Sequence, residues 1–181
     1  MKHFSISNYK ISNKSKPFII AEISSNHKGS LSSILKLIKE IKLAGADAVK
    51  IQTYNEDIMT LDSKKKNFKI NKGIWKNYSL YKLYKEAKTP FSWHKYIFDY
   101  AKKIGIICFS TPFDEKSCDF LSKFRVPAYK IASYELVDIP LIKYISKKGK
   151  PIIISSGMAS LNEIQEALMA IKKTKNNKVI L

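Results

Sequence analysis

The chain has 181 residues with 33 basic and 15 acidic side chains, which gives a formal net charge of +18. Its 45% hydrophobic and 12% aromatic content is enough for a sizeable core and excludes an intrinsically disordered chain. Two cysteines, Cys108 and Cys118, exclude a disulfide scaffold and favour a cytoplasmic protein. No apolar run approaches the roughly 20 residues of a membrane span, and residues 1–16 lack the apolar core of a signal peptide, so no membrane partner is expected.

Short apolar runs alternate with amphipathic stretches along the chain. The runs are nearly continuous in apolar character, which is typical of strands covered on both faces. The amphipathic stretches repeat apolar residues at helical spacing, and one of them begins with a capping box, Ser160 and Glu163. In chain order we predict an N-terminal extension or hairpin (1–16), strand 17–23, helix 31–41, strand 48–52, a long connection 54–91 with a short helix at 80–87, helix 93–104, strands 106–109, 128–132 and 151–154, helix 161–171 and strand 178–181.

This alternation predicts an α/β fold with a parallel sheet and helices outside it, in which residues 17–181 form one domain. Two architectures remain open. One is an open, doubly wound sheet. The other is a (β/α)8 TIM barrel truncated after about its sixth strand, since a complete barrel needs eight strands and about 250 residues. Periodicity alone does not separate the two.

Polar residues interrupt the apolar strands at or near their carboxyl ends, the edge where parallel α/β sheets bind ligands. Lys50 and Lys130 lie within apolar strands, where an ammonium is costly without an anionic partner. With the nearby hydroxyls they predict a site for a phosphate or a carboxylate. The alternative is that each lysine forms a structural ion pair with Glu22 or Glu135. The candidate strand-end residues are Glu22, Lys50, Gln52, Ser110, Thr111, Lys130, Ser133, Glu135, Ser155 and Ser156.

Histidine and cysteine carry weaker signals. His27 follows the first strand and is interpreted as a base, as a contact to a sugar hydroxyl or as a residue that stabilises the turn. His94 lies on the apolar stripe of a helix, which indicates packing in the core. Cys108 and Cys118 have no C-x-x-C spacing, so neither is predicted to bind metal or act as a nucleophile. The chain has no glycine-rich dinucleotide or P-loop motif.

The basic charge by itself suggests a different class, a non-enzymatic nucleic-acid-binding domain. Lysine is spread along the whole chain, however, and Arg125 is the only arginine, although arginine is the preferred reader of bases and phosphates. The pattern therefore favours a solvated surface, and no nucleic-acid partner is expected.

Five motifs, in order and spacing, resemble the sialic acid synthase family (N-acetylneuraminate synthase-like) over nearly the whole chain from about Pro17. Residues 52–94, with their many aromatic side chains, are most similar to the pseudaminic acid synthase branch of that family. The motifs are Ala21-Glu22 with Asn26-His27 and Gly29; residues 44–53, AGADAVKIQT; Ser110-Thr111-Pro112-Phe113; residues 127–133, PAYKIAS; and Lys150-Pro151 leading into Ser155-Ser156-Gly157-Met158.

The resemblance implies a (β/α)8 barrel followed by a small antifreeze-like domain, in a homodimer. It implies condensation of phosphoenolpyruvate with the open-chain form of an amino sugar, 2,4-diacetamido-2,4,6-trideoxy-altrose, to give a nonulosonic acid and phosphate. A synthase for N-acetylneuraminate or legionaminate is the alternative. The residues implied to bind phosphoenolpyruvate are Lys50, Thr111, Lys130, Ser133 and Ser155; those implied to be catalytic are Glu22 and Glu135; and those implied to bind the sugar are Gln52, Asn26 and His27.

The resemblance also implies a divalent metal, Mn²⁺, as cofactor. The two metal-binding histidines of the family would fall beyond Leu181, so no metal ligand is assigned in this chain, and the isolated 181 residues are expected to be inactive. Lys28 stands where the family often has asparagine, a difference in the loop that follows the first strand.

Overall fold

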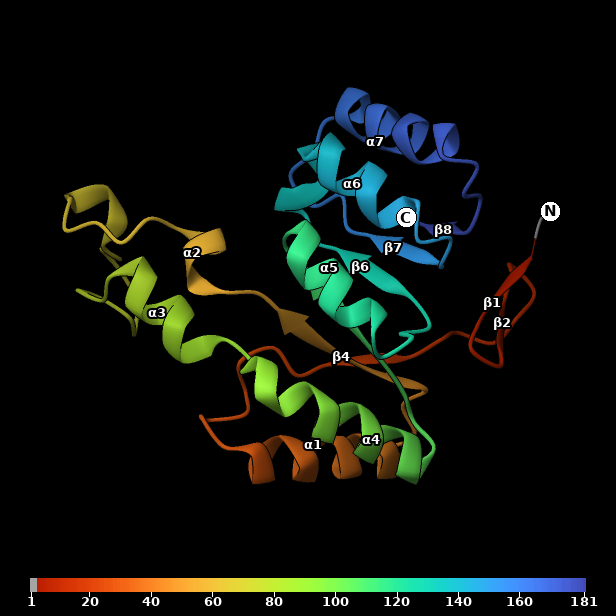
Figure 1. The fold of residues 1–181 in the computed structure, drawn as a ribbon, viewed down its shortest axis with the longest axis horizontal. Helices are drawn as coiled ribbons and strands as arrows, with labels where there is room; N and C mark the ends of the chain where they lie inside the picture. Colours follow the sequence, from red (N-terminus) through yellow and green to blue (C-terminus); the bar gives the residue numbers. More distant parts are fainter. Residues whose placement is uncertain (1–2) are drawn as a thin grey trace.

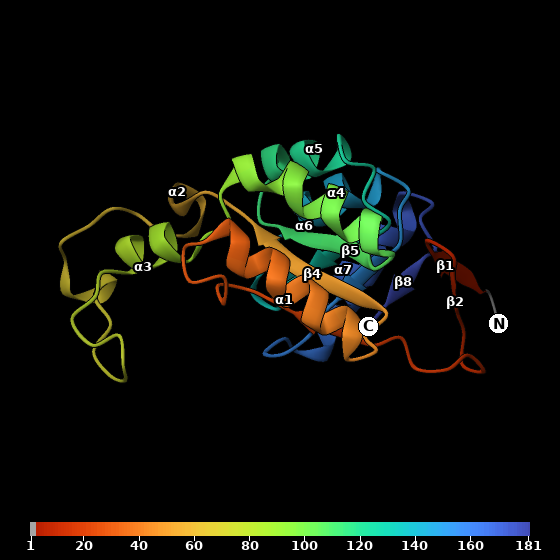
Figure 2. The same ribbon diagram turned by 90° about the horizontal axis from the view of Figure 1, so that it is seen from below.

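The computed structural model describes residues 3–181 (Figures 1 and 2). Its main feature is a curled, six-stranded parallel sheet whose spatial order is its chain order. A doubly wound sheet reverses its strand order at a switch point, so that alternative is wrong, and the sheet is a half-barrel. Its strands are β3 (Ile20–Glu22), β4 (Ala48–Thr53), β5 (Ile107–Pro112), β6 (Tyr129–Ile131), β7 (Ile152–Ile154) and β8 (Val179–Ile180).

The predicted strands are all present, but the first is shorter than the predicted 17–23. Pro17 has no N–H to donate to a neighbouring strand. The N–H of Ile19 donates to Asp47 Oδ2 at 2.8 Å instead of joining the ladder. Regular pairing therefore begins at Ile20, opposite Ala48.

Five helices cover the outer face of the sheet (Figures 1 and 2). Side chains that accept from a backbone N–H cap several of their first turns, among them Ser30, Asp114 and Ser160, and the predicted capping box is present. We did not predict a range for α5 or α6. The helices are α1 (Leu31–Leu43), α4 (His94–Ile104), α5 (Glu115–Ser122), α6 (Ile139–Ser146) and α7 (Leu161–Lys173).

Side chains alternate between the two faces of each strand, and this alternation separates the core from the site. Outward residues such as Val49, Ile51 and Ile131 pack under the helices. Inward residues near the strand starts, such as Ala48 and Phe109, form a smaller apolar cluster. Further along the strands the inward positions become polar.

An N-terminal hairpin closes the apolar end of the half-barrel. β1 (Phe4–Ile6) pairs antiparallel with β2 (Tyr9–Ile11), and the fully buried Ile6 packs against the inner apolar cluster. In Figure 1 the hairpin lies at the opposite end of the sheet from α2 and α3. The carboxyl edge of the sheet is therefore left free for ligands.

The long connection after β4 forms an arm that extends beyond this carboxyl edge (Figures 1 and 2). The predicted short helix at 80–87 is confirmed as α3. Lys88 pairs with the buried Glu56, and Tyr81 donates to Asp57 at 2.8 Å, so the two helices of the arm are tied together. The arm contains α2 (Glu56–Met59), α3 (Leu80–Ala87) and the 3-10 turns η1 (Lys66–Phe68) and η2 (Phe91–Trp93); a third 3-10 turn, η3 (Tyr134–Val137), follows β6.

No helix within residues 3–181 is long and apolar enough to cross a membrane.

Candidate active site

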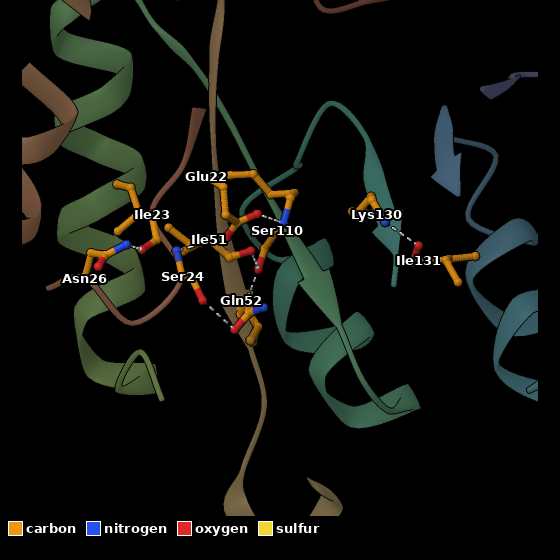
Figure 3. A network of polar contacts seen from close by, with 11 residues as sticks. Glu22, Ile23, Ser24, Asn26, Ile51, Gln52, Ser110, Lys130 and Ile131 are labelled. Atoms are coloured by element: carbon orange, nitrogen blue, oxygen red, sulfur yellow. Dashed lines mark hydrogen bonds and ion pairs between the residues drawn. The ribbon is translucent and has the colours of Figure 1, made fainter. Parts of the chain in front are cut away.

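Lys50 lies on the inner face of β4 and forms an ion pair with Glu22 at the end of β3. Glu22 Oε1 also accepts from the N–H of Ser24 at 2.9 Å, and the Ser24 hydroxyl donates to Gln52 Oε1 at 3.3 Å (Figure 3). For Lys50 the structural ion pair that we considered as an alternative is therefore present. The Glu22 carboxylate of this ion pair is accessible to solvent, because the Glu22 side chain is 39% exposed.

Lys130 has no such partner. It lies on β6, and its ammonium donates to the backbone carbonyl of Ile131 at 2.5 Å (Figure 3). None of the ion pairs among residues 3–181 includes it. Burial lowers the pKa of Lys130 to about 8, although the charge of Glu135 opposes the shift. A half-buried ammonium without a carboxylate partner is the feature expected of an anion-binding site.

The two lysines are close enough for their charges to interact. The pKa of Lys50 is lowered to about 8, first by burial and then by the positive charge of Lys130. An anion between them would be attracted by both ammoniums and would raise both pKa values. The two lysines thus form a positively charged region at the strand ends that is suited to an anion.

Two further polar atoms near the lysines are buried without a hydrogen-bond partner among residues 3–181: Thr111 Oγ1 and Glu135 Oε2. Native proteins leave few buried polar atoms unpaired, so each such atom requires an explanation. Thr111 is only 1% exposed and follows Ser110 on β5, where the sequence predicted a ligand-binding hydroxyl. Burial raises the pKa of Glu135, and nearby Lys130 opposes that shift.

Ser133 and Ser155 follow the next two strands. The N–H of Ser155 donates to the Ile131 carbonyl at 3.1 Å, which continues the β6–β7 ladder by one residue. A Cβ atom on Gly157 would lie 2.8 Å from Ser133 Oγ, so a larger residue at this position would require the Ser133 side chain to move. The bare backbone of the β7–α7 loop thus packs directly against the Ser133 hydroxyl.

His27 is buried, and both of its ring nitrogens are occupied within the protein. Nδ1 accepts from the N–H of Gly29 at 3.1 Å, so Nε2 carries the proton and donates to the Ala87 carbonyl at 3.1 Å. His27 therefore stabilises the turn and also ties it to α3, which is one of its predicted roles, and its contact with a sugar stays a prediction. Asn26 is exposed, and its amide donates to the Ile23 carbonyl at 3.0 Å.

A buried polar network lies behind the site, and the sequence analysis did not identify it. His94 packs in the core as expected, but its Nε2 lies 2.8 Å from Thr53 Oγ1, which in turn lies 2.6 Å from Ser110 Oγ. The His94 Nδ1–H donates to the Pro90 carbonyl at 3.0 Å, so Nε2 accepts from Thr53. Thr53 follows Gln52 and Ser110 precedes Thr111, so the network holds the ends of β4 and β5 in register.

Stability is expected to fall on acidification because of His94. Burial lowers its pKa from 6.5 to about 4, so between these values the unfolded chain binds a proton that the folded chain does not. The free energy of unfolding should therefore decrease as the pH falls from 6.5 to 4, by at most about 3 kcal/mol. Urea unfolding across this range measures the slope. The His94→Gln variant should lose it and the exposed His3→Gln control should keep it; an unchanged slope in His94→Gln would contradict the assignment.

A cavity of about 790 Å³ adjoins the strand ends between the loop after β3 and the arm. Gln52 lies at its inner side, and Tyr54, Trp75 and Tyr84 contribute aromatic walls. A second cavity of about 770 Å³ lies around residues 98–108 and 123–127 and contains none of the strand-end candidates. The sequence showed the aromatic residues of the arm but not that they enclose a space.

The residues present do not build a metal site by themselves. Within residues 3–181 no group of three or more histidine, cysteine, aspartate or glutamate side chains is placed to hold a metal ion. The implied Mn²⁺ therefore has no ligand set among the described side chains.

The fold and the strand-end residues define a class of protein: a parallel α/β half-barrel with two lysines, Lys50 and Lys130, at the carboxyl edge of its strands. The model of the NeuB family matches residues 37–181, and the chain belongs to this family.

The comparisons with individual proteins agree with this assignment. The chain is 48% identical over 165 residues to a pseudaminic acid synthase of Campylobacter jejuni, covering 91% of this chain and 48% of that one. It is 41% identical to a pseudaminic acid synthase of Helicobacter pylori, with the same coverage. The structure of an N-acetylneuraminic acid synthetase from Leptospira borgpetersenii superposes with a TM-score of 0.83 at 30% identity, covering 97% of this chain and 56% of that one. The chain spans about half the length of the curated relatives it matches.

Proposed function

We propose that this chain carries the phosphoenolpyruvate-binding part of a nonulosonic acid synthase of the pseudaminic type, with its half-barrel forming part of an eight-stranded barrel. The observation that carries the proposal is Lys130, a half-buried ammonium without a carboxylate partner, in the same inner face as Lys50 and the unpaired Thr111 hydroxyl. The identities of 48% and 41% to pseudaminic acid synthases support a synthase of the pseudaminic type. The identity to an N-acetylneuraminic acid synthetase is lower, at 30%. Legionaminate remains an alternative within the same reaction class.

In the proposed reaction, C3 of phosphoenolpyruvate attacks the aldehyde carbon of the open-chain amino sugar, and the aldehyde oxygen takes up a proton. Positive charge develops at C2, where water adds. The bond between C2 and the oxygen that it shares with phosphorus then breaks. The new C2 hydroxyl loses its proton, C2 becomes a ketone, and inorganic phosphate leaves. Lys50, Lys130 and the hydroxyls of Thr111, Ser133 and Ser155 would hold the phosphate and carboxylate charges throughout.

Glu135 is suited to take the proton of the attacking water. Its carboxylate has one oxygen buried without a partner, and its raised pKa brings it nearer to neutrality, where a general base is most effective. Glu22 is engaged with Lys50 and the Ser24 N–H, so in the proposal it stabilises charge at the reacting centre.

The test is release of inorganic phosphate from phosphoenolpyruvate by the full-length protein, with 2,4-diacetamido-2,4,6-trideoxy-altrose and Mn²⁺ in the assay. We expect release with this sugar and at most slow release with N-acetylmannosamine.

Because both lysines have a pKa of about 8, they lose positive charge above that pH. The KM for phosphoenolpyruvate should therefore rise about tenfold between pH 8 and pH 9. A constant KM up to pH 9.5 would contradict this pH dependence, and faster release with N-acetylmannosamine would overturn the choice of sugar.

A further inference from the structure

We propose that His94 is a positioning residue for the proposed phosphoenolpyruvate site, and that its buried hydrogen-bond network sets the place of the Thr111 hydroxyl. This inference rests on the proposed function. It concerns the outer face of the sheet and assigns a kinetic role to side chains that contact no substrate in the proposal. The observation that carries it is the series of short hydrogen bonds that leads from the start of α4 to the ends of β4 and β5.

The network lies directly behind the inner face of the sheet at the strand ends. Ile51 of β4 and Cys108 of β5 belong to the outer cluster under the helices. Thr53 and Ser110 lie two residues further along these strands and therefore face outward as well. Thr111 follows Ser110 on the chain and faces the inner side. A shift of the backbone at Ser110 therefore moves Thr111 with it.

Thr53 is the centre of the network because its hydroxyl both donates and accepts. Burial lowers the pKa of His94 to about 4, so the ring is neutral at pH 7. Thr53 donates to Nε2 of this ring, 2.8 Å away, since Nδ1–H donates to the Pro90 carbonyl. The Ser110 hydroxyl lies 2.6 Å from Thr53 Oγ1 and 3.1 Å from the Ile51 carbonyl oxygen, so its one proton is shared between two acceptors. Removing the Thr53 hydroxyl would therefore break two short contacts at once.

The end of β5 depends on this network because its pairing with β6 is short. The ladder between β5 and β6 has a single register pair, Ser110 with Tyr129. Thr111 Oγ1 has no hydrogen-bond partner among residues 3–181, so its own side chain does not hold it in place. The position of this hydroxyl is therefore set by the neighbouring Ser110, which the network holds against β4.

The His94 ring is itself held from several sides and is fully buried. Its Nδ1–H donates to the Pro90 carbonyl at 3.0 Å, which ties the ring to the segment that leads from the arm into α4. Phe91 stacks on the ring with the centres 5.7 Å apart, and Phe120 of α5 contacts it edge-on at 5.1 Å. A ring fixed in this way keeps the hydroxyls in place before phosphoenolpyruvate binds. A residue without substrate contact can thereby affect affinity.

The experiment measures the KM for phosphoenolpyruvate and kcat by phosphate release, at saturating amino sugar, in variants of the full-length protein. Thr53→Val removes the hydroxyl and keeps the branched shape, whereas Thr53→Ser keeps the hydroxyl. Ser146→Ala is the matched control, because Ser146 is buried at the end of α6 and its Oγ lies 2.6 Å from Thr174 Oγ1. Thr53→Val is also combined with Thr111→Val, which removes the hydroxyl on which the network is proposed to act.

We expect Thr53→Val to raise the KM for phosphoenolpyruvate about tenfold and to change kcat less than about threefold, because the placement of a binding hydroxyl is lost. In the Thr111→Val background the same substitution should change KM less than about twofold, since the hydroxyl that it positions is already absent. Thr53→Ser should match the unmodified protein. Ser146→Ala should lower the melting temperature and leave KM unchanged.

Equal effects of Thr53→Val on KM in the two backgrounds, or a lower melting temperature with an unchanged KM, would show that the network is only structural. Either result would overturn this inference and leave the proposed function intact. A rise in KM of the same size in Ser146→Ala would overturn it as well, because it would trace the effect to loss of stability. An unmodified protein that releases no phosphate from phosphoenolpyruvate would overturn the proposed function and this inference with it.

Discussion

Replacing Lys130 with methionine is expected to weaken phosphoenolpyruvate binding strongly and, at the same time, to stabilise the fold. Within residues 3–181 the ammonium of Lys130 donates to the Ile131 carbonyl and forms no ion pair, and burial lowers its pKa to about 8, well below the ordinary 10.5. At pH 7 the charged form is therefore held at a cost, which the methionine side chain removes. We expect the free energy of unfolding to rise by roughly 1–2 kcal/mol, after allowing for the partial exposure of this side chain.

The functional loss should be large because a charge-assisted contact to the anion disappears. Such contacts contribute about 1.5–3 kcal/mol each, which corresponds to a loss of roughly 10- to 150-fold in affinity. Calorimetric titration with phosphoenolpyruvate and urea unfolding measure the two effects on one preparation. Lys103→Met, on the exposed side of α4, is the matched control and should change neither. A Lys130→Met variant that is less stable and binds phosphoenolpyruvate normally would identify Lys130 as a structural residue.

The Glu135→Gln variant is expected to bind phosphoenolpyruvate nearly as well as the unmodified protein but to release phosphate about 10²- to 10⁴-fold more slowly, the range for loss of a general base. Glutamine keeps the shape of the side chain and cannot accept the proton of the attacking water. Because Glu135 has a raised pKa and a buried oxygen without a partner, its replacement by a neutral amide should leave stability nearly unchanged.

The readout that separates catalysis from positioning is the acidic limb of the pH–rate profile. A base that works only when deprotonated makes kcat fall as the pH drops through its pKa, so this limb should disappear in Glu135→Gln. Glu166→Gln on the exposed side of α7 is the matched control and should retain both the rate and the profile. If Glu135→Gln keeps the acidic limb and loses less than about threefold in kcat, the base is another residue and Glu22 becomes the next candidate.

Much of the architecture follows from local patterns in the sequence. Each of the predicted strands and the helix at 80–87 is present, because continuous apolar runs and helical spacing depend on neighbours only a few residues away. Several of the predicted strand-end candidates also lie together at one edge, whereas Ser110 faces the opposite side and joins the network of His94. Side chains alternate along a strand, and all strands of a parallel sheet end at the same edge, so Lys50, Gln52 and Lys130 had to share a region once the sheet was parallel.

The tertiary structure decided what depends on residues distant in the chain. Strand order and curl distinguish the half-barrel from a doubly wound sheet, because they depend on which strands pair and not on where strands occur. His27 donates a hydrogen bond to the Ala87 carbonyl, 60 residues further along the chain. The network of His94 joins residues that are up to 57 positions apart in the sequence. No periodicity over a few residues encodes such contacts.

The same distinction applies to the site. The sequence by itself determined the chemical types at the carboxyl edge: two lysines, several hydroxyls and two carboxylates. Only the tertiary structure decided that Glu22 pairs with Lys50 and leaves Lys130 without a carboxylate, and that the arm encloses an aromatic cavity beside Gln52. The physical reason is that residue type and alternation are properties of the local chain, whereas burial, pKa and cavity shape arise from the packing of segments that the chain keeps far apart.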